Sequence, residues 1–168
     1  LGRGESIADT ARVLSRYVDA IVARVYRQSD LVEMARYADV PVINALSDMY
    51  HPCQIVADLY TMLEKFGYLR GLKVAYIGDG NNVCNSLLIG CSKMGLDLSI
   101  ACPEGYEPSA EAIRFAEKNS EHSGSKIEIL RDPFSAVKDA NIIYTDTFVS
   151  MGDEAEREER LRVFLPKY

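Results

Sequence analysis

Residues 72–82 read LKVAYIGDGNN, and this segment sets the interpretation of the whole chain. The apolar run from Leu72 to Ile77 predicts a buried strand, the Gly78-Asp79-Gly80 turn follows at once, and a helix is expected from Asn82. Direct passage from a strand into a helix is typical of parallel sheets, which bind ligands at the carboxyl ends of their strands. We therefore expect an α/β protein with a candidate binding turn at residues 78–82.

Apolar strands and amphipathic helices alternate on both sides of this segment. Before it, we expect helices at 6–19, 30–38 and 52–66, and strands at 20–26 and 40–46. After it, we expect helices at 82–94, 110–119, 134–139 and 153–162, and strands at 98–102, 126–130 and 141–146. This order predicts parallel sheets with helices on both faces.

The tract Gly67-Tyr68-Leu69-Arg70-Gly71 separates the two alternating runs and predicts two domains. We expect one domain at 1–51, a connecting helix and linker at 52–71, and a second domain at 72–168. The first run has too few strands for an independent sheet, and no later element closes the second. Both domains are therefore expected to be incomplete.

Composition limits the class of protein. The chain has 168 residues, 48% of them hydrophobic, and a formal net charge of −6, so we expect a soluble globular protein. No apolar run is long enough for a membrane span, and the charged residues between Leu1 and Arg12 argue against a signal peptide. We therefore expect a cytoplasmic protein. The basic residues are scattered, which argues against a nucleic-acid partner.

The four cysteines, Cys53, Cys84, Cys91 and Cys102, have no C-x-x-C spacing, and the two histidines are far apart. This pattern argues against a metal site and predicts reduced, mostly buried thiols.

The Gly78-Asp79-Gly80 turn resembles part of a dinucleotide fingerprint, but Val83 stands where the third glycine belongs. A nicotinamide cofactor is therefore a minor alternative. Asn81 and Asn82 allow two interpretations. One of them caps the helix, or Asn82 presents its amide to a carboxylate.

Asp146 follows the last strand of the same sheet, so we expect it near Asn82. An acceptor for an ammonium group beside a donor for a carboxylate would suit an α-amino acid. The alternative is ordinary turn chemistry, since Ser150 and Gly152 follow closely.

His51-Pro52-Cys53-Gln54 lies where a strand passes into a helix. Pro52 suits the first helical position, which leaves His51 and Gln54 at the electropositive helix start, a place for an anion. Alternatively, His51 caps the helix and Gln54 is solvated. Arg24 is unexpected within the apolar strand at 20–26.

Taken together, these motifs resemble the carbamoyltransferase family over nearly the whole chain. The matching residues are Arg3-Gly4-Glu5-Ser6, Asp9-Thr10-Ala11-Arg12-Val13-Leu14, Arg24, His51-Pro52-Cys53-Gln54, Gly78-Asp79-Gly80-Asn81-Asn82, and Asp146 with Ser150-Met151-Gly152. The Asp-x-x-x-Ser-Met-Gly pattern is similar to the ornithine branch of the family rather than the aspartate branch.

The resemblance implies transfer of a carbamoyl group from carbamoyl phosphate to the side-chain amine of L-ornithine, which gives citrulline, without a cofactor. It implies that Arg24 and His51 stabilise the carbonyl oxygen and that Gln54 holds the carbamoyl amide. It further implies a homotrimer and a role in arginine metabolism.

For the acceptor, the resemblance implies that Asn82 and Asp146 bind the α-carboxylate and α-amino groups of ornithine. Ser150 and Met151 would lie on a loop that closes over it.

Two family motifs are absent from the chain: a Ser-Thr-Arg-Thr phosphate loop expected before Leu1, and a His-Cys-Leu-Pro segment expected after Tyr168. The resemblance thus implies the middle part of such an enzyme, and the phosphate would lose much of its compensating charge without that loop. Two alternatives remain: a carbamoyltransferase for another amine such as aspartate, or a non-catalytic fragment or binding module.

Overall fold

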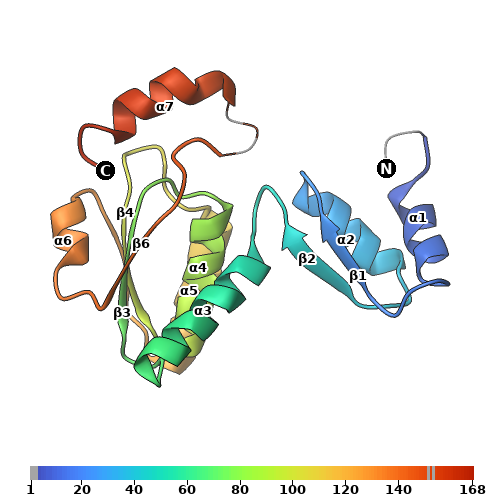
Figure 1. Cartoon of the computed structure of the whole chain (residues 1–168), viewed down its shortest axis with the longest axis horizontal. Coiled ribbons are helices and arrows are strands. Elements are labelled where there is room, and N and C mark those ends of the chain that lie inside the picture. The colour runs from blue at the N-terminus through green and yellow to red at the C-terminus, as the bar shows by residue number, and fades with distance from the viewer. Residues whose placement is uncertain (1–3, 151, 153) are drawn as a thin grey trace. The chain divides into compact units, whose positions relative to one another are not determined.

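A computed structural model of the chain describes residues 4–150, 152 and 154–168, in which helices and strands alternate (Figure 1). The chain forms two compact units, one ending at Gln54 and the other beginning at Ile55. The division falls near the start of helix α3 (Pro52–Phe66).

The first unit pairs two short parallel strands. Its elements are α1 (Ile7–Leu14), β1 (Ile21–Arg24), α2 (Gln28–Tyr37) and β2 (Val42–Leu46). Ala11 from α1, Ile21 from β1 and Met34 from α2 form the buried cluster. Both helices therefore pack on one face of this sheet, while Val22 and Ile43 on the other face are 64% and 43% exposed.

The second unit contains a four-stranded parallel sheet in the order β5-β4-β3-β6. Its strands are β3 (Lys73–Ile77), β4 (Asp97–Ala101), β5 (Ile127–Leu130) and β6 (Ile142–Thr145). Its other elements are α4 (Asn82–Met94), α5 (Ala110–Ser123), α6 (Pro133–Val137), the 3₁₀ helix η1 (Glu154–Glu156) and α7 (Arg157–Phe164). Figure 1 shows α4 and α5 on one side of this sheet and α6 on the other, so the predicted fold class is confirmed.

The core of the second unit surrounds β3. Val74, Ala75 and Tyr76 are fully buried, because this strand has a neighbour on each edge and helices over each face. Leu87 and Leu88 from α4 are buried as well. The apolar run from Val74 to Ile77 in β3 is the pattern that such a central strand requires.

Several helices differ from expectation: α5 continues to Ser123 rather than to residue 119, and α7 begins at Arg157 rather than at residue 153. The helix expected at 6–19 ends at Leu14, because the Ser15 hydroxyl donates to the Ala11 carbonyl (2.8 Å) and accepts from the Asp39 N–H (3.0 Å), which ties this end to the loop after α2. In α3, the i, i+4, i+8 spacing of Ile55, Leu59 and Leu63 predicts that Leu63 is buried. It is instead 41% exposed, and Met62 is buried in its place. The spacing from Ile55 to Met62 corresponds to two helical turns.

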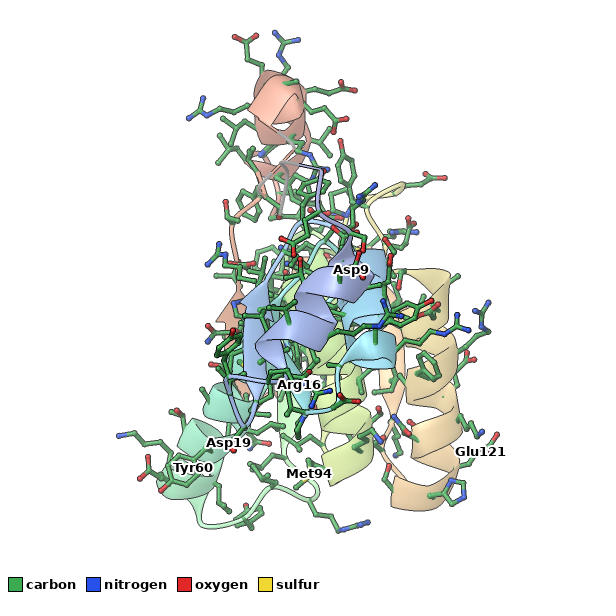
Figure 2. The ribbon with its side chains drawn as sticks, turned by 90° about the vertical axis from the view of Figure 1, so that its right-hand side faces the viewer. Asp9, Arg16, Asp19, Tyr60, Met94 and Glu121 are labelled. Carbon is green, nitrogen blue, oxygen red and sulfur yellow. The ribbon has the colours of Figure 1, made fainter. Side chains whose placement is uncertain are left out.

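Several polar and aromatic side chains extend outward from the helices. Figure 2 shows Asp9 on α1 and Arg16 just beyond its end, with Tyr60 on α3 and Glu121 on α5. In the part of the chain that the structure describes, no helix has the length and apolar character needed to cross a bilayer.

Gly80 is in tight contact with the loop between β4 and α5. Its N–H donates to the Tyr106 carbonyl at 2.8 Å, and a Cβ at this position would lie 2.2 Å from backbone atoms of Glu107 and Pro108. Only glycine fits here without moving the loop.

We predict that Gly80→Ala lowers the free energy of unfolding by about 3 kcal/mol or more, since backbone atoms must move apart. Gly105→Ala is the matched control in the same loop: its backbone is left-handed (φ +85°) but nothing lies within 4 Å of the added carbon. The control should cost about 1–2 kcal/mol from backbone strain alone. Urea unfolding followed by circular dichroism measures both, and equal losses would contradict the contact argument.

All four cysteines are free, as predicted; Cys53 is exposed and the other three are buried. Burial raises the pKa of the Cys91 thiol to about 12 and that of Cys102 to about 11. Burial also raises the pKa of Cys84 well above its ordinary value. These three thiols are protonated at neutral pH and out of contact with solvent.

A maleimide reagent should therefore label one thiol per native chain at pH 7, at Cys53, and all four after unfolding in urea. Mass spectrometry of the intact chain counts the labels. The Cys53→Ser variant should take up none in the native state, and fast native labelling of that variant would show that the buried thiols open to solvent.

Candidate functional site

Arg24 lies at the carboxyl end of β1, where the sheet register shifts so that it pairs with Leu46. Its side chain is exposed, as are those of Val22 and Tyr26. The expected strand at 20–26 is present but shorter, at Ile21–Arg24, and its expected burial is wrong for Val22 and Arg24, whereas Ile21 is buried. The strand is short and only one of its faces is covered by helices, so the other face and the carboxyl end remain open.

A turn braced by Ser47 leads from β2 to α3. Ser47 is fully buried, and its hydroxyl donates to Gln28 Oε1 at 2.6 Å and accepts from the Tyr50 N–H at 3.1 Å. The Ser47 N–H donates to the Tyr50 carbonyl at 2.8 Å. These contacts fix the loop that delivers the chain to His51.

Pro52 is the first residue of α3, as predicted from its fixed φ. His51 immediately precedes the helix and Gln54 lies in its first turn, and both are half-buried. Each is thus close to the backbone N–H groups at the N-terminus of the helix, which carry its positive partial charge. The first unit presents Arg24, His51 and Gln54 after the carboxyl ends of its two parallel strands.

In the second unit, the parallel pairing of β3 with β6 aligns Ile77 with Thr145. The turn at 78–82 and the segment beginning at Asp146 therefore leave the sheet at the same edge.

Asn81 connects these two segments. Its Nδ2 donates to Asp146 Oδ2 at 2.9 Å and to Ser150 Oγ at 3.2 Å. Its Oδ1 accepts from the N–H groups of Val83 and Cys84, which caps the N-terminus of α4. Asn82 is the first residue of the helix and is half-buried beside them.

A buried ion pair supports this turn. Arg160 of α7 donates to Asp79 Oδ2 at 2.8 Å, with both side chains about one-tenth exposed. Breaking such a pair from one side costs about 3–5 kcal/mol, because the remaining charge stays buried. The Arg160 guanidinium also lies over the Tyr106 ring at 5.2 Å.

Tyr76 of β3 also stabilises this turn. Its hydroxyl donates to the Asp79 carbonyl at 2.8 Å, and burial raises its pKa far above the ordinary value. The hydroxyl therefore keeps its proton and this hydrogen bond at all physiological pH values. The turn is fixed by neighbours on several sides.

The predicted site residues fall into two groups, one in each unit: Arg24, His51 and Gln54 in the first, and Asn82, Asp146 and Ser150 in the second. Met151 and Arg3 lie outside the described residues. Among the described residues, no three His, Cys, Asp or Glu side chains gather closely enough to hold a metal ion.

Three side-chain contacts in and beside the second group have no signal in the sequence. Asn81 was recognised as a possible cap, but its bonds to Asp146 and Ser150 were not foreseen. Arg160 lies in a strongly charged helix and carried no sequence signal of its buried partner Asp79.

Comparison with known families gives matches to both units. Residues 1–64 match the family model of aspartate/ornithine carbamoyltransferase, carbamoyl-P binding domain. Residues 70–168 match aspartate/ornithine carbamoyltransferase, Asp/Orn binding domain.

Individual relatives agree with these matches. The chain is 60% identical to ornithine carbamoyltransferase of Pyrococcus horikoshii and 58% identical to that of Bacillus subtilis, covering 99% of this chain and 52% of each relative. The solved structure of ornithine carbamoyltransferase from Pyrococcus furiosus superposes with a TM-score of 0.93 at 59% identity, covering 99% of this chain and 53% of that one.

The chain thus spans about half the length of the curated relatives it matches. Family matches to nearly every residue, together with this identity and superposition, lead to one conclusion: the chain belongs to the aspartate/ornithine carbamoyltransferase family.

Proposed function

We propose that this chain is the central part of an enzyme that transfers the carbamoyl group of carbamoyl phosphate to the side-chain amine of L-ornithine, which yields L-citrulline and phosphate. The observation that carries the proposal is the cluster of Asn81, Asp146 and Ser150 at one sheet edge, in residues that match the Asp/Orn binding domain. The identity of 60% to an ornithine carbamoyltransferase supports ornithine as the acceptor.

In this proposal, 1–51 contributes to carbamoyl-phosphate binding, 52–71 connects, and 72–168 contributes to ornithine binding. Arg24, His51 and Gln54 contact carbamoyl phosphate. The guanidinium and imidazole stabilise charge on the carbonyl oxygen, and the Gln54 carboxamide hydrogen-bonds the carbamoyl amide. The helix N-terminus beside His51 and Gln54 favours an anionic substrate.

For the acceptor, we propose that the Asn82 amide donates to the α-carboxylate of ornithine and that Asp146 accepts from its α-ammonium group. Ser150 and Met151, which follow Asp146 closely in the sequence, contribute further contacts to ornithine. Binding both α-substituents fixes the side chain, which directs its terminal amine at the carbamoyl carbon.

The reaction needs a neutral amine. The lone pair of the side-chain nitrogen forms a bond with the carbamoyl carbon, and negative charge builds on the carbonyl oxygen. The bond from that carbon to the bridging oxygen then breaks, phosphate leaves with the electron pair, and the nitrogen loses a proton to solvent or phosphate. Positioning and charge stabilisation account for this chemistry without a cofactor.

We further propose that the active form is a longer protein that includes this chain, works in arginine metabolism and assembles as a homotrimer. The half-length coverage of the relatives supports a longer protein, and the resemblance supports the trimer. Four unpaired thiols are consistent with a reducing compartment such as the cytoplasm.

The acceptor is tested by measuring product formation with ornithine and with aspartate at equal concentration. We expect a longer protein carrying this chain to form citrulline with a kcat/KM for ornithine at least about 10³-fold above that for aspartate, since buried polar groups reject an ill-matched acceptor strongly. Equal or greater use of aspartate would make this an aspartate-type transferase, and no product with either would favour a non-catalytic role.

Arg24→Met tests the carbamoyl-phosphate half of the site. In the same longer protein we expect kcat to fall by about 10²–10³-fold, because a charge that stabilises the transition state is lost. Thermal stability should hardly change, since this side chain is exposed. Arg16→Met, which removes an equal charge at another exposed position of the same unit, is the control and should retain normal turnover. Normal turnover in Arg24→Met would remove Arg24 from the site.

A further inference from the structure

Asn81 uses every hydrogen-bonding group of its side chain. Its two amide hydrogens go to Asp146 Oδ2 (2.9 Å) and Ser150 Oγ (3.2 Å). The two acceptor positions of its oxygen take the N–H groups of Val83 (3.0 Å) and Cys84 (3.1 Å). One short side chain therefore joins the start of α4 to the segment after β6.

Few other side chains of this size make both sets of contacts. Aspartate has the same shape and caps a helix well, but it has no hydrogen to donate and adds a charge that repels Asp146. Serine also caps a helix well, but its hydroxyl is too close to the backbone to replace the amide group that bonds Asp146. Helix capping alone would accept any of the three residues, so the bonds from Nδ2 are the specific feature of asparagine here.

We propose that Asn81 is a positioning residue for the acceptor site: it holds the Asp146 carboxylate and the Ser150 hydroxyl in place before the amino-acid substrate binds. This inference rests on the proposed function for the identity of the substrate. It goes beyond that function because Asn81 acts through Asp146 and Ser150.

The orientation of Asp146 matters because a carboxylate has about four acceptor positions, and the bond to Asn81 occupies one of them. The others stay available for an ammonium group. A carboxylate that is already oriented loses less conformational entropy when the substrate binds, so binding is stronger. Losing this orientation should therefore weaken binding of the amino acid and leave binding of carbamoyl phosphate unchanged.

The test compares Asn81→Ser and Asn81→Asp with wild type in the longer protein that carries this chain. We expect both variants to raise KM for ornithine by about tenfold or more, as loss of a hydrogen bond to a charged group predicts, with the larger effect in Asn81→Asp. KM for carbamoyl phosphate should stay within about twofold, since the hydrogen bonds described for Asn81 join residues of the second unit.

Ser109→Ala is the matched control. Ser109 caps α5 through a bond from the Ala112 N–H to its hydroxyl (3.2 Å), and it belongs to neither proposed substrate group. This variant should lower the thermal midpoint without changing either KM. Asn81→Ser should behave in the opposite way, with a nearly normal midpoint and a raised KM for ornithine, because serine retains the cap.

A second measurement does not depend on turnover. Amide hydrogen exchange over residues 146–150 should be about tenfold faster or more in Asn81→Ser than in wild type, and unchanged in Ser109→Ala. Unchanged exchange, or a KM for ornithine within twofold of wild type, would overturn the role of Asn81. Absence of citrulline formation by wild type would instead overturn the proposed function, while the exchange result would still decide whether Asn81 holds this segment.

Discussion

Strand β3 lies between β4 and β6, and its parallel pairing with β6 brings together the residues that we propose bind the acceptor. These two strands are far apart in the sequence, yet their carboxyl ends meet, which brings Asn81 within 2.9 Å of Asp146. The ion pair of Asp79 with Arg160 and the hydrogen bond from Tyr76 then fix the turn that carries Asn81. Without the strand pairing, Asn81 and Asp146 would not be neighbours.

The sequence was sufficient for most of the fold because local signals agreed with one another. The helix from Asn82 to Met94 has the predicted bounds: Asn81 caps its start and Gly95, in a left-handed conformation, ends it. Periodicity was less reliable where burial depends on distant partners. Met62 rather than Leu63 is buried in α3, and the strand around Arg24 is open on one face, since single-sequence patterns do not say which face receives a cover.

The site was predictable to the extent that it follows from topology. Placing Asp146 at the same edge as the 78–82 turn required only that both segments follow parallel strands. The individual contacts needed coordinates. Nothing in the sequence shows that Asn81 bonds to Asp146 after β6, and a buried arginine in a helix as charged as α7 resembles its solvated neighbours.

Gly80 has a consequence for how this part of the chain can vary. The loop from Pro103 to Pro108 rests directly on the backbone of Gly80 and bonds to its N–H through Tyr106. Tyr106 also packs against Phe164 and lies under Arg160, so the loop is held on both sides. An insertion or deletion in this loop would displace the turn that precedes Asn81. We therefore expect its length to be nearly constant wherever the turn and its asparagine are retained, even though surface loops usually tolerate such changes.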